Sequence, residues 1–105
     1  MIETYPDTEP TRAEIDALAG PALLEFGSPA CGYCRRTQPM LREALEMHPG
    51  VRHVKVADAS GRRLGRSFRV KRWPTLVFLD NGKEVARLVR PADAAEIASA
   101  LETID

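Results

Sequence analysis

The 105-residue chain lacks the features that would place it in a membrane or in a secretory pathway. No apolar run reaches the roughly 18 residues that a membrane-spanning helix needs. Residues 1–7 are acidic and contain a proline, and they lack the basic-then-apolar order of a secretory signal. We therefore expect a cytoplasmic protein with no membrane partner.

Cysteine and aromatic residues are also scarce. The two cysteines are too few for a disulfide framework, and a chain of this length buries a core without one. The net charge is zero, although residues 31–72 hold eleven Lys or Arg against three acids. The arginine cluster at residues 62–72 offers no set of interleaved aromatic side chains for stacking on bases, so we expect no nucleic-acid partner.

The two cysteines that are present stand close together, as Cys31-Gly32-Tyr33-Cys34. An apolar run at residues 22–26 precedes them, and a helical pattern extends from Cys31 to about residue 46. In a cytosolic protein such a pair indicates redox chemistry or metal binding.

Metal binding is the weaker of these two interpretations. With His48 and His53, the cysteines match the spacing of a two-Cys, two-His zinc finger. A finger places both histidines on one continuous helix, but Pro49-Gly50 interrupts the chain between them. We expect no metal, with His48 at a helix end and His53 on the surface of a strand.

Redox chemistry suits a Cys-x-x-Cys pair at the start of a helix. The unpaired N–H groups and the dipole of the helix favour the thiolate of Cys31. Cys31 then attacks a disulfide, a mixed disulfide forms, and Cys34 resolves it. A purely structural disulfide is the alternative, but so small a ring removes little chain entropy.

The remaining pattern predicts an α/β domain with a mixed sheet. A capping box at Thr11–Glu14 begins a short helix. Turn signals and apolar periodicity then predict the later elements in this order: strands at 22–26 and 51–56, a short helix within 58–70, a hairpin of strands 75–79 and 83–89, and a helix at 91–104. We interpret the chain as one domain, residues 1–105, with residues 1–7 a loose extension or a short edge strand.

Four features resemble the thioredoxin family, over nearly the whole chain from about residue 8. Glu25 lies six residues before Cys31, where thioredoxins place a buried Asp. The Cys31–Cys34 pair, the helix proline Pro39 and the segment Trp73–Thr75 match the redox centre, the helix-kinking proline and the cis-proline motif. The resemblance implies the thioredoxin fold, a central mixed sheet with helices on both faces.

The resemblance also implies roles for single residues. Cys31 and Cys34 would be the catalytic pair, Glu25 a buried proton acceptor for Cys34 rather than a partly solvated acid, and Lys55 the partner of that acid. The backbone of Trp73 would pair with a substrate segment as an added strand. The substrate-binding residues would be Gly32, Tyr33, Trp73, a cis Pro74, Thr75 and Arg90.

The chain departs from the thioredoxin pattern at three places. Ala30 stands where thioredoxins have Trp, and Trp73 either replaces that contact surface or fills core. Gly32-Tyr33 stands in place of Gly-Pro and is similar to the dipeptide of bacterial disulfide isomerases, and Arg90 stands in place of a groove glycine. If the N–H of Tyr33 points at Cys31, it favours the thiolate and makes the centre more oxidising than thioredoxin; otherwise Tyr33 is an exposed aromatic that contacts substrate.

These features predict an enzyme, a protein-disulfide oxidoreductase of electron transport and cell redox homeostasis. We expect it to need no cofactor beyond its reversible Cys31–Cys34 disulfide and to act as a monomer. Its partners would be disulfide-containing proteins and a reductase or glutathione as electron donor. The alternatives are an isomerase, an oxidase or a glutathione-linked protein, or a binding module of the same fold without redox turnover.

Overall fold

The computed structural model describes all residues, 1–105. Its elements follow the order α1 (Arg12–Asp16), β1 (Pro21–Gly27), α2 (Gly32–Glu46), β2 (Arg52–Ala57), α3 (Arg63–Ser67), β3 (Thr75–Asp80), β4 (Lys83–Val89) and α4 (Ala94–Glu102). This is the predicted order. None of the four helices combines the length and the apolar character that crossing a membrane requires.

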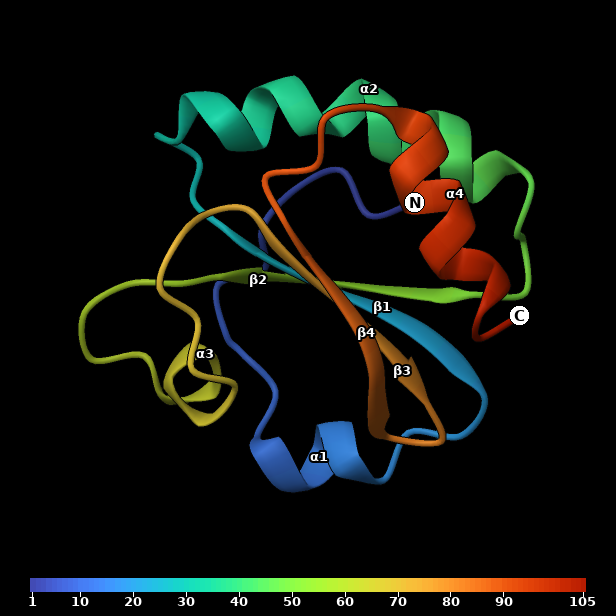
Figure 1. Ribbon diagram of the computed structural model, residues 1–105. Coiled ribbons are helices and arrows are strands. Elements are labelled where there is room, and N and C mark those ends of the chain that lie inside the picture. The colour runs from blue at the N-terminus through green and yellow to red at the C-terminus, as the bar shows by residue number, and fades with distance from the viewer.

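The four strands form one mixed sheet in the order β2-β1-β3-β4. β1 runs parallel to β2 and antiparallel to β3, and β4 is antiparallel to β3. Helices α2 and α4 lie over one face of the sheet, and α1 and α3 lie near the other (Figure 1). The predicted α/β domain with helices on both faces is therefore confirmed.

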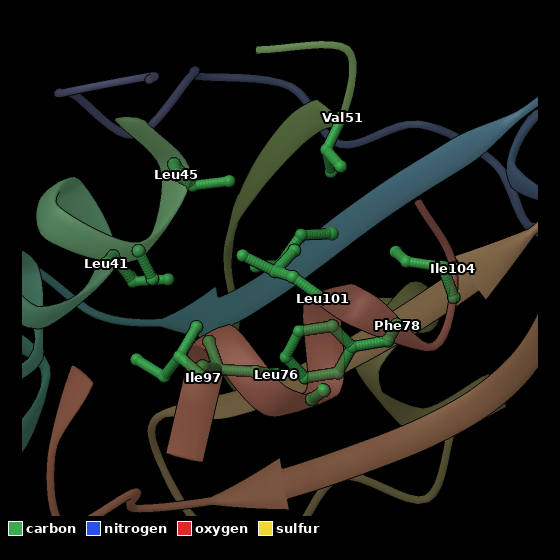
Figure 2. Close-up of a cluster of buried hydrophobic side chains, with 11 residues drawn as sticks. Leu41, Leu45, Val51, Leu76, Phe78, Ile97, Leu101 and Ile104 are labelled. Atoms are coloured by element: carbon green, nitrogen blue, oxygen red, sulfur yellow. The ribbon is translucent and has the colours of Figure 1, made fainter. Parts of the chain in front are cut away.

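Two hydrophobic clusters, one on each face of the sheet, make up the core. On the α2 and α4 face, Leu76 and Phe78 of β3 pack with Leu41 of α2 and with Ile97 and Leu101 of α4 (Figure 2). On the other face, the alternate residues of β1, β2 and β3 pack against α1 and α3. This second cluster consists of Ile15, Ala22, Leu24, Phe26, Val56, Leu64, Phe68, Val77 and Leu79. This alternation explains why the two central strands are almost wholly apolar.

The local signals also predicted the ends of the elements. Thr11 and Glu14 form both hydrogen bonds of a capping box at the start of α1. Asn81 and Gly82 turn the β3–β4 hairpin with φ angles of 50° and 78°, the left-handed region that such turns require. The last helix begins three residues later than predicted, because Asp93 is its N-cap and its side chain accepts a hydrogen bond from the N–H of Glu96.

Residues 1–7 form no edge strand, which was one of the two alternatives for this segment. β2 is buried on both faces, because the face opposite Val56 holds Lys55, which is buried as well. Lys55 lies on the side of the sheet that α2 covers, and in the parallel register it is directly beside Glu25 of β1.

Candidate active site

Cys31 occupies the N-cap of α2, at the end of the loop that follows β1. Its sulfur accepts a hydrogen bond from the backbone N–H of Cys34 at 3.1 Å, and its own N–H donates to Ser28. It is half-buried, and no disulfide links it to Cys34. Its sulfur thus lies at the helix N-terminus, where the helix dipole and an N–H favour negative charge.

Cys34 lies one helical turn further on and is shielded from solvent. Its residue is 2% exposed, in contact with the loop that carries Cys31. Burial first, and then the neighbouring Cys31, raise the pKa of Cys34 to about 12, while the backbone of Ser28 and the hydroxyl of Tyr5 act in the opposite direction. Cys34 therefore stays a thiol at neutral pH unless a neighbouring group takes its proton.

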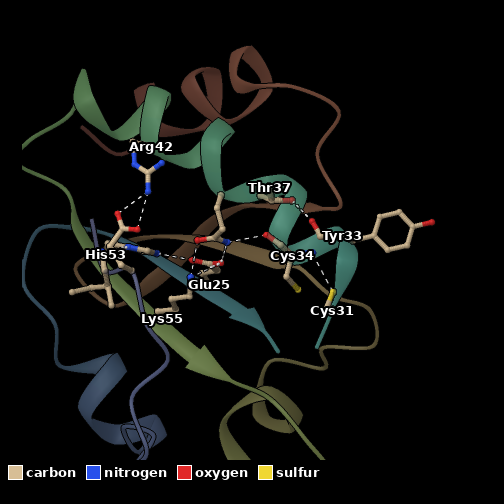
Figure 3. A network of polar contacts seen from close by, with 11 residues as sticks. Glu25, Cys31, Tyr33, Cys34, Thr37, Arg42, His53 and Lys55 are labelled. Carbon is tan, nitrogen blue, oxygen red and sulfur yellow. Dashed lines mark hydrogen bonds and ion pairs between the residues drawn. The ribbon is translucent and has the colours of Figure 1, made fainter. Parts of the chain in front are cut away.

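Glu25 supplies a carboxylate behind the cysteine pair. It is 0% exposed, and its oxygens accept a hydrogen bond from Gln38 at 2.8 Å and lie 3.7 Å from the ammonium of Lys55. Gln38 also donates to the carbonyl of Cys34 at 2.9 Å, so one side chain contacts both the acid and the resolving cysteine (Figure 3). The predicted proximity of Glu25 and Lys55 is confirmed, and the partly solvated alternative for Glu25 is wrong.

His53 is the third partner of Glu25. The prediction that His53 lies on the surface of its strand is therefore wrong. Its side chain is only 3% exposed, and its Nε2 lies 2.8 Å from the carboxylate of Glu25. Its Nδ1 accepts the backbone N–H of Ile2 at 2.9 Å, so both ring nitrogens are engaged. The polar face of β2 is buried because Glu25 supplies the partner that a buried polar side chain needs.

Gln38 and Tyr5 also lie at the site and were not predicted from the sequence. Gln38 is positioned by α2, and its Oε1 accepts from Lys55 at 2.6 Å. Tyr5 comes from the N-terminal segment, which Glu3 ties to α2 through two contacts of 2.8 Å with Arg42. The only signal in the sequence was indirect: a lone acid in an apolar strand must find polar partners.

The other side of the cysteine pair is formed by the segment before β3. The Trp73–Pro74 peptide bond is cis, as the resemblance implied. The carbonyl oxygen of Trp73 lies 3.9 Å from the sulfur of Cys31, and the indole N–H donates to Asp58 at 2.9 Å. Thr75 is buried and donates its hydroxyl hydrogen bond to Arg72.

Arg90 contacts the segment before β3 and also lies against Tyr33. Arg90 has a φ of 52°, a conformation that glycine adopts without strain, in keeping with the glycine that the resemblance places there. Its Nε donates to the carbonyl of Trp73 at 2.9 Å, and its guanidinium lies 4.0 Å from the centre of the Tyr33 ring. Tyr33 is 46% exposed and points outward, and a second guanidinium, from Arg36, lies 5.1 Å from its ring.

Of the two alternatives for Tyr33, the hydrogen bond from its N–H to Cys31 does not form. The N–H that reaches the sulfur of Cys31 belongs to Cys34, the third residue of the helix, which is a usual donor to an N-cap side chain. The guanidinium of Arg35 donates to the carbonyl of Pro29. The exposed-aromatic interpretation of Tyr33 is the one that fits this geometry.

The two histidines and the two cysteines do not converge. His48 lies after the end of α2 and contacts Asp105 at 2.6 Å, whereas His53 contacts Glu25. The structure contains no group of three or more His, Cys, Asp or Glu side chains arranged to hold a metal ion. The zinc-finger spacing therefore does not correspond to a shared site.

A model of the thioredoxin family matches residues 7–103 of this chain. The chain belongs to the thioredoxin family. The structure of thioredoxin 2 from Pseudomonas aeruginosa PAO1 in its reduced form superposes with a TM-score of 0.87 and 52% identity, covering 98% of this chain and 95% of that one. Thioredoxin from Haemophilus influenzae is 34% identical over 80 residues, 75% of each chain.

Other relatives in the thioredoxin family are longer than this chain. Protein disulfide-isomerase erp38 of Neurospora crassa is 38% identical over 68 residues, but the match spans only 18% of its length. The match to thioredoxin H2-1 of Oryza sativa covers 59% of that protein. The similarity to these proteins thus concerns one redox domain.

Proposed function

We propose that the protein is a thiol–disulfide oxidoreductase that reduces protein disulfides through Cys31 and Cys34. The observation that carries the proposal is the asymmetry of the pair: Cys31 is half-buried at a helix N-terminus, and Cys34 is buried beside a carboxylate network. The membership of the thioredoxin family and the likeness to a reduced thioredoxin support it.

The proposed reaction has two exchange steps. The thiolate of Cys31 attacks a substrate disulfide, so that a mixed disulfide forms and one substrate thiolate leaves. Cys34 then gives up its proton, with Glu25 as the acceptor, directly or through water, and its thiolate attacks the sulfur of Cys31. The Cys31–Cys34 bond forms as the bond to the substrate breaks, which oxidises the protein dithiol and reduces the substrate disulfide.

The contact between the sulfur of Cys31 and the carbonyl of Trp73 supports a role in substrate binding for the residues around it. Trp73, cis Pro74 and Thr75 form one side, and the proposed substrate strand would pair with the backbone of Trp73. Gly32 is exposed at the first position of α2, which leaves the approach to the sulfur of Cys31 open from that side. Tyr33 and Arg90 border the other side.

Reduction of insulin disulfides tests this function. With dithiothreitol as the electron donor, we expect the wild-type protein to accelerate insulin reduction and Cys31→Ser to leave only the rate of the donor alone. Cys34→Ser retains the attacking thiol and serves as the matched variant for the resolving step. A wild-type protein that fails to accelerate the reaction would instead favour the binding module without redox turnover.

We further propose that the centre is more oxidising than thioredoxin, whose potential is about −270 mV. Support comes from Arg90, whose Nε donates to the carbonyl of Trp73 that lies 3.9 Å from the sulfur of Cys31, since positive charge favours a nearby thiolate. Equilibration with glutathione buffers measures the potential. A value at or below that of thioredoxin would refute this finer proposal, and a higher one would make isomerase activity worth measuring on a scrambled disulfide substrate.

The proposed setting is a cytoplasmic monomer that uses its reversible disulfide and no other cofactor. Its electrons would come from a reductase or from glutathione, since a dithiol that has reduced a substrate must itself be reduced. The rate of insulin reduction with each donor in turn distinguishes the two. Size-exclusion chromatography tests the monomer.

A further inference from the structure

Tyr5 brings a hydroxyl group to the redox centre from outside the thioredoxin-like motifs. Its ring lies 4.6 Å from the ammonium of Lys55, and its hydroxyl oxygen is buried. That oxygen makes no other hydrogen bond within the protein, and its contact with Cys34 lowers the pKa of that thiol. A buried hydroxyl with this single neighbour points to a role at the cysteine.

Gly27 places the hydroxyl of Tyr5 beside the sulfur of Cys34. A Cβ atom on this glycine would lie 2.5 Å from the hydroxyl oxygen of Tyr5 and 2.9 Å from the sulfur of Cys34. The two groups are thus neighbours over the last residue of β1, in space that only a glycine leaves free. Burial and the nearby Cys34 and Glu25 keep the pKa of Tyr5 above its ordinary value, so the hydroxyl keeps its proton.

A cavity of about 400 Å³ adjoins both groups, on the α2 side of the N-terminal segment. Tyr5, Cys34, Gln38 and Lys55 are among the residues that line it. Such a volume holds several water molecules, each of which occupies about 30 Å³ in the liquid. Water in this cavity lies next to Tyr5 and Cys34, so a proton released by Cys34 has a route to solvent.

We propose that the hydroxyl of Tyr5 donates a hydrogen bond to the sulfur of Cys34 while that sulfur is a thiolate attacking the mixed disulfide. The inference rests on the proposed function. Tyr5 keeps its proton throughout: the thiol proton of Cys34 goes to Glu25 or to solvent, the Cys34–Cys31 bond forms, and the substrate leaves as a thiolate. A hydrogen bond to a charged sulfur is stronger than one to a neutral thiol, so the contact between Tyr5 and Cys34 favours the thiolate that attacks the mixed disulfide.

The other groups that face Cys34 do not duplicate this role. Cys31 raises the pKa of Cys34, and Ser28 acts through its backbone. Gln38 contacts the carbonyl of Cys34 and not its sulfur, and Lys55 is engaged by Gln38 and Glu25. Tyr5 is thus the one side-chain hydroxyl that acts to lower the pKa of Cys34.

Stopped-flow mixing with dithiobis(nitrobenzoate) in excess separates the two exchange steps. The first coloured thiolate is released when Cys31 attacks the reagent, and the second when Cys34 resolves the mixed disulfide. Tyr5→Phe keeps the ring and removes only the hydroxyl. We expect it to slow the second release about tenfold or more, as for a lost hydrogen bond to a charged group, and to leave the first unchanged. Thr8→Val, which removes an exposed hydroxyl from the same segment, should change neither phase.

The pH dependence of the second release distinguishes this role from packing. Tyr5→Phe should shift the rise of the second rate to higher pH, whereas a packing residue would leave that profile in place. An unchanged second phase, or an equal slowing of both phases, would overturn the inference. A wild-type protein that releases no second thiolate would instead overturn the proposed function, so the two failures are distinguishable.

Discussion

The side chain of Arg90 donates a hydrogen bond from Nε to the carbonyl oxygen of Trp73 at 2.9 Å, while its guanidinium lies against the ring of Tyr33. The same carbonyl lies 3.9 Å from the sulfur of Cys31. A substrate strand that pairs with the backbone of Trp73 would therefore compete with Arg90 for this carbonyl. Substrate selectivity then depends on how well a substrate replaces the hydrogen bond from Arg90 to the carbonyl of Trp73.

Replacing Arg90 with glycine tests this competition. Glycine suits the φ of 52° at this position, and the carbonyl of Trp73 becomes free for substrate. We expect kcat/KM for insulin reduction to rise about two- to tenfold, the value of one net hydrogen bond. Arg87→Ala, in the strand β4 that ends just before Arg90, is the matched control, because Arg87 is paired with Glu84 instead. A fall in kcat/KM would mean that Arg90 binds the substrate and does not compete with it.

The raised pKa of Cys34 predicts a loss of stability in alkaline solution. The folded protein holds this proton up to a pKa of about 12, whereas the unfolded chain releases it near the ordinary value of 9.0. The stabilising contribution is thus complete below pH 9.0 and is lost as the pH rises toward 12. Denaturant unfolding of the reduced protein at about pH 7 and about pH 10 measures it. Cys34→Ala should lose less stability over this interval, and equal losses would contradict the prediction.

Gly27→Ala should disrupt the contact between Tyr5 and Cys34. The added methyl group meets both the hydroxyl oxygen and the sulfur at less than ordinary contact distance. We expect the free energy of unfolding to fall by about 1–3 kcal/mol, as for an overpacked core. Gly50→Ala is the control, because its Cβ would have its nearest neighbour 3.7 Å away, the carboxylate of Asp105. Equal stability of the two variants would show that the segment around Tyr5 yields without cost.

His53→Ala should leave an oxygen of the buried Glu25 without its partner at 2.8 Å. We expect a loss of about 1–3 kcal/mol in the free energy of unfolding, the cost of an unsatisfied buried group. His48→Ala removes the more exposed pair with Asp105 and should cost only about 0–1 kcal/mol. Chemical denaturation of both variants checks the difference, and the reverse order would refute the role given to His53.

Local and periodic patterns predicted the order of the elements and a mixed sheet, whereas the resemblance to thioredoxins supplied the helices on both faces of it. The capping box at Thr11, the hairpin turn at Asn81-Gly82 and the apolar strands each act within a few residues, so the sequence shows them directly. The cysteine pair at the start of α2 was predictable in the same way, because a strand, a loop and a helix start lie next to one another in the chain.

The inner partners of the site were not predictable from such patterns. In the sequence, His53 alternates with valines, which is typical of a residue on the exposed face of a strand. Only the register of β2 against β1 places His53 next to Glu25. Tyr5 lies more than 20 residues from Gly27 in a segment without periodicity. The sequence left open whether the N–H of Tyr33 reaches Cys31, because the first turn of α2 decides which N–H points at the sulfur, and it is that of Cys34.

The central claim is that Cys31 attacks and Cys34 resolves, and trapping the mixed disulfide tests it most directly. Cys34→Ser and Cys31→Ser are each incubated with insulin whose disulfides are intact, and the products are analysed by mass spectrometry without reductant. We predict that Cys34→Ser accumulates a covalent adduct with an insulin chain through Cys31, and that Cys31→Ser accumulates none, because Cys34 is buried and remains a thiol. Comparable adducts on Cys34 in Cys31→Ser, or no adduct in either variant, would contradict the account.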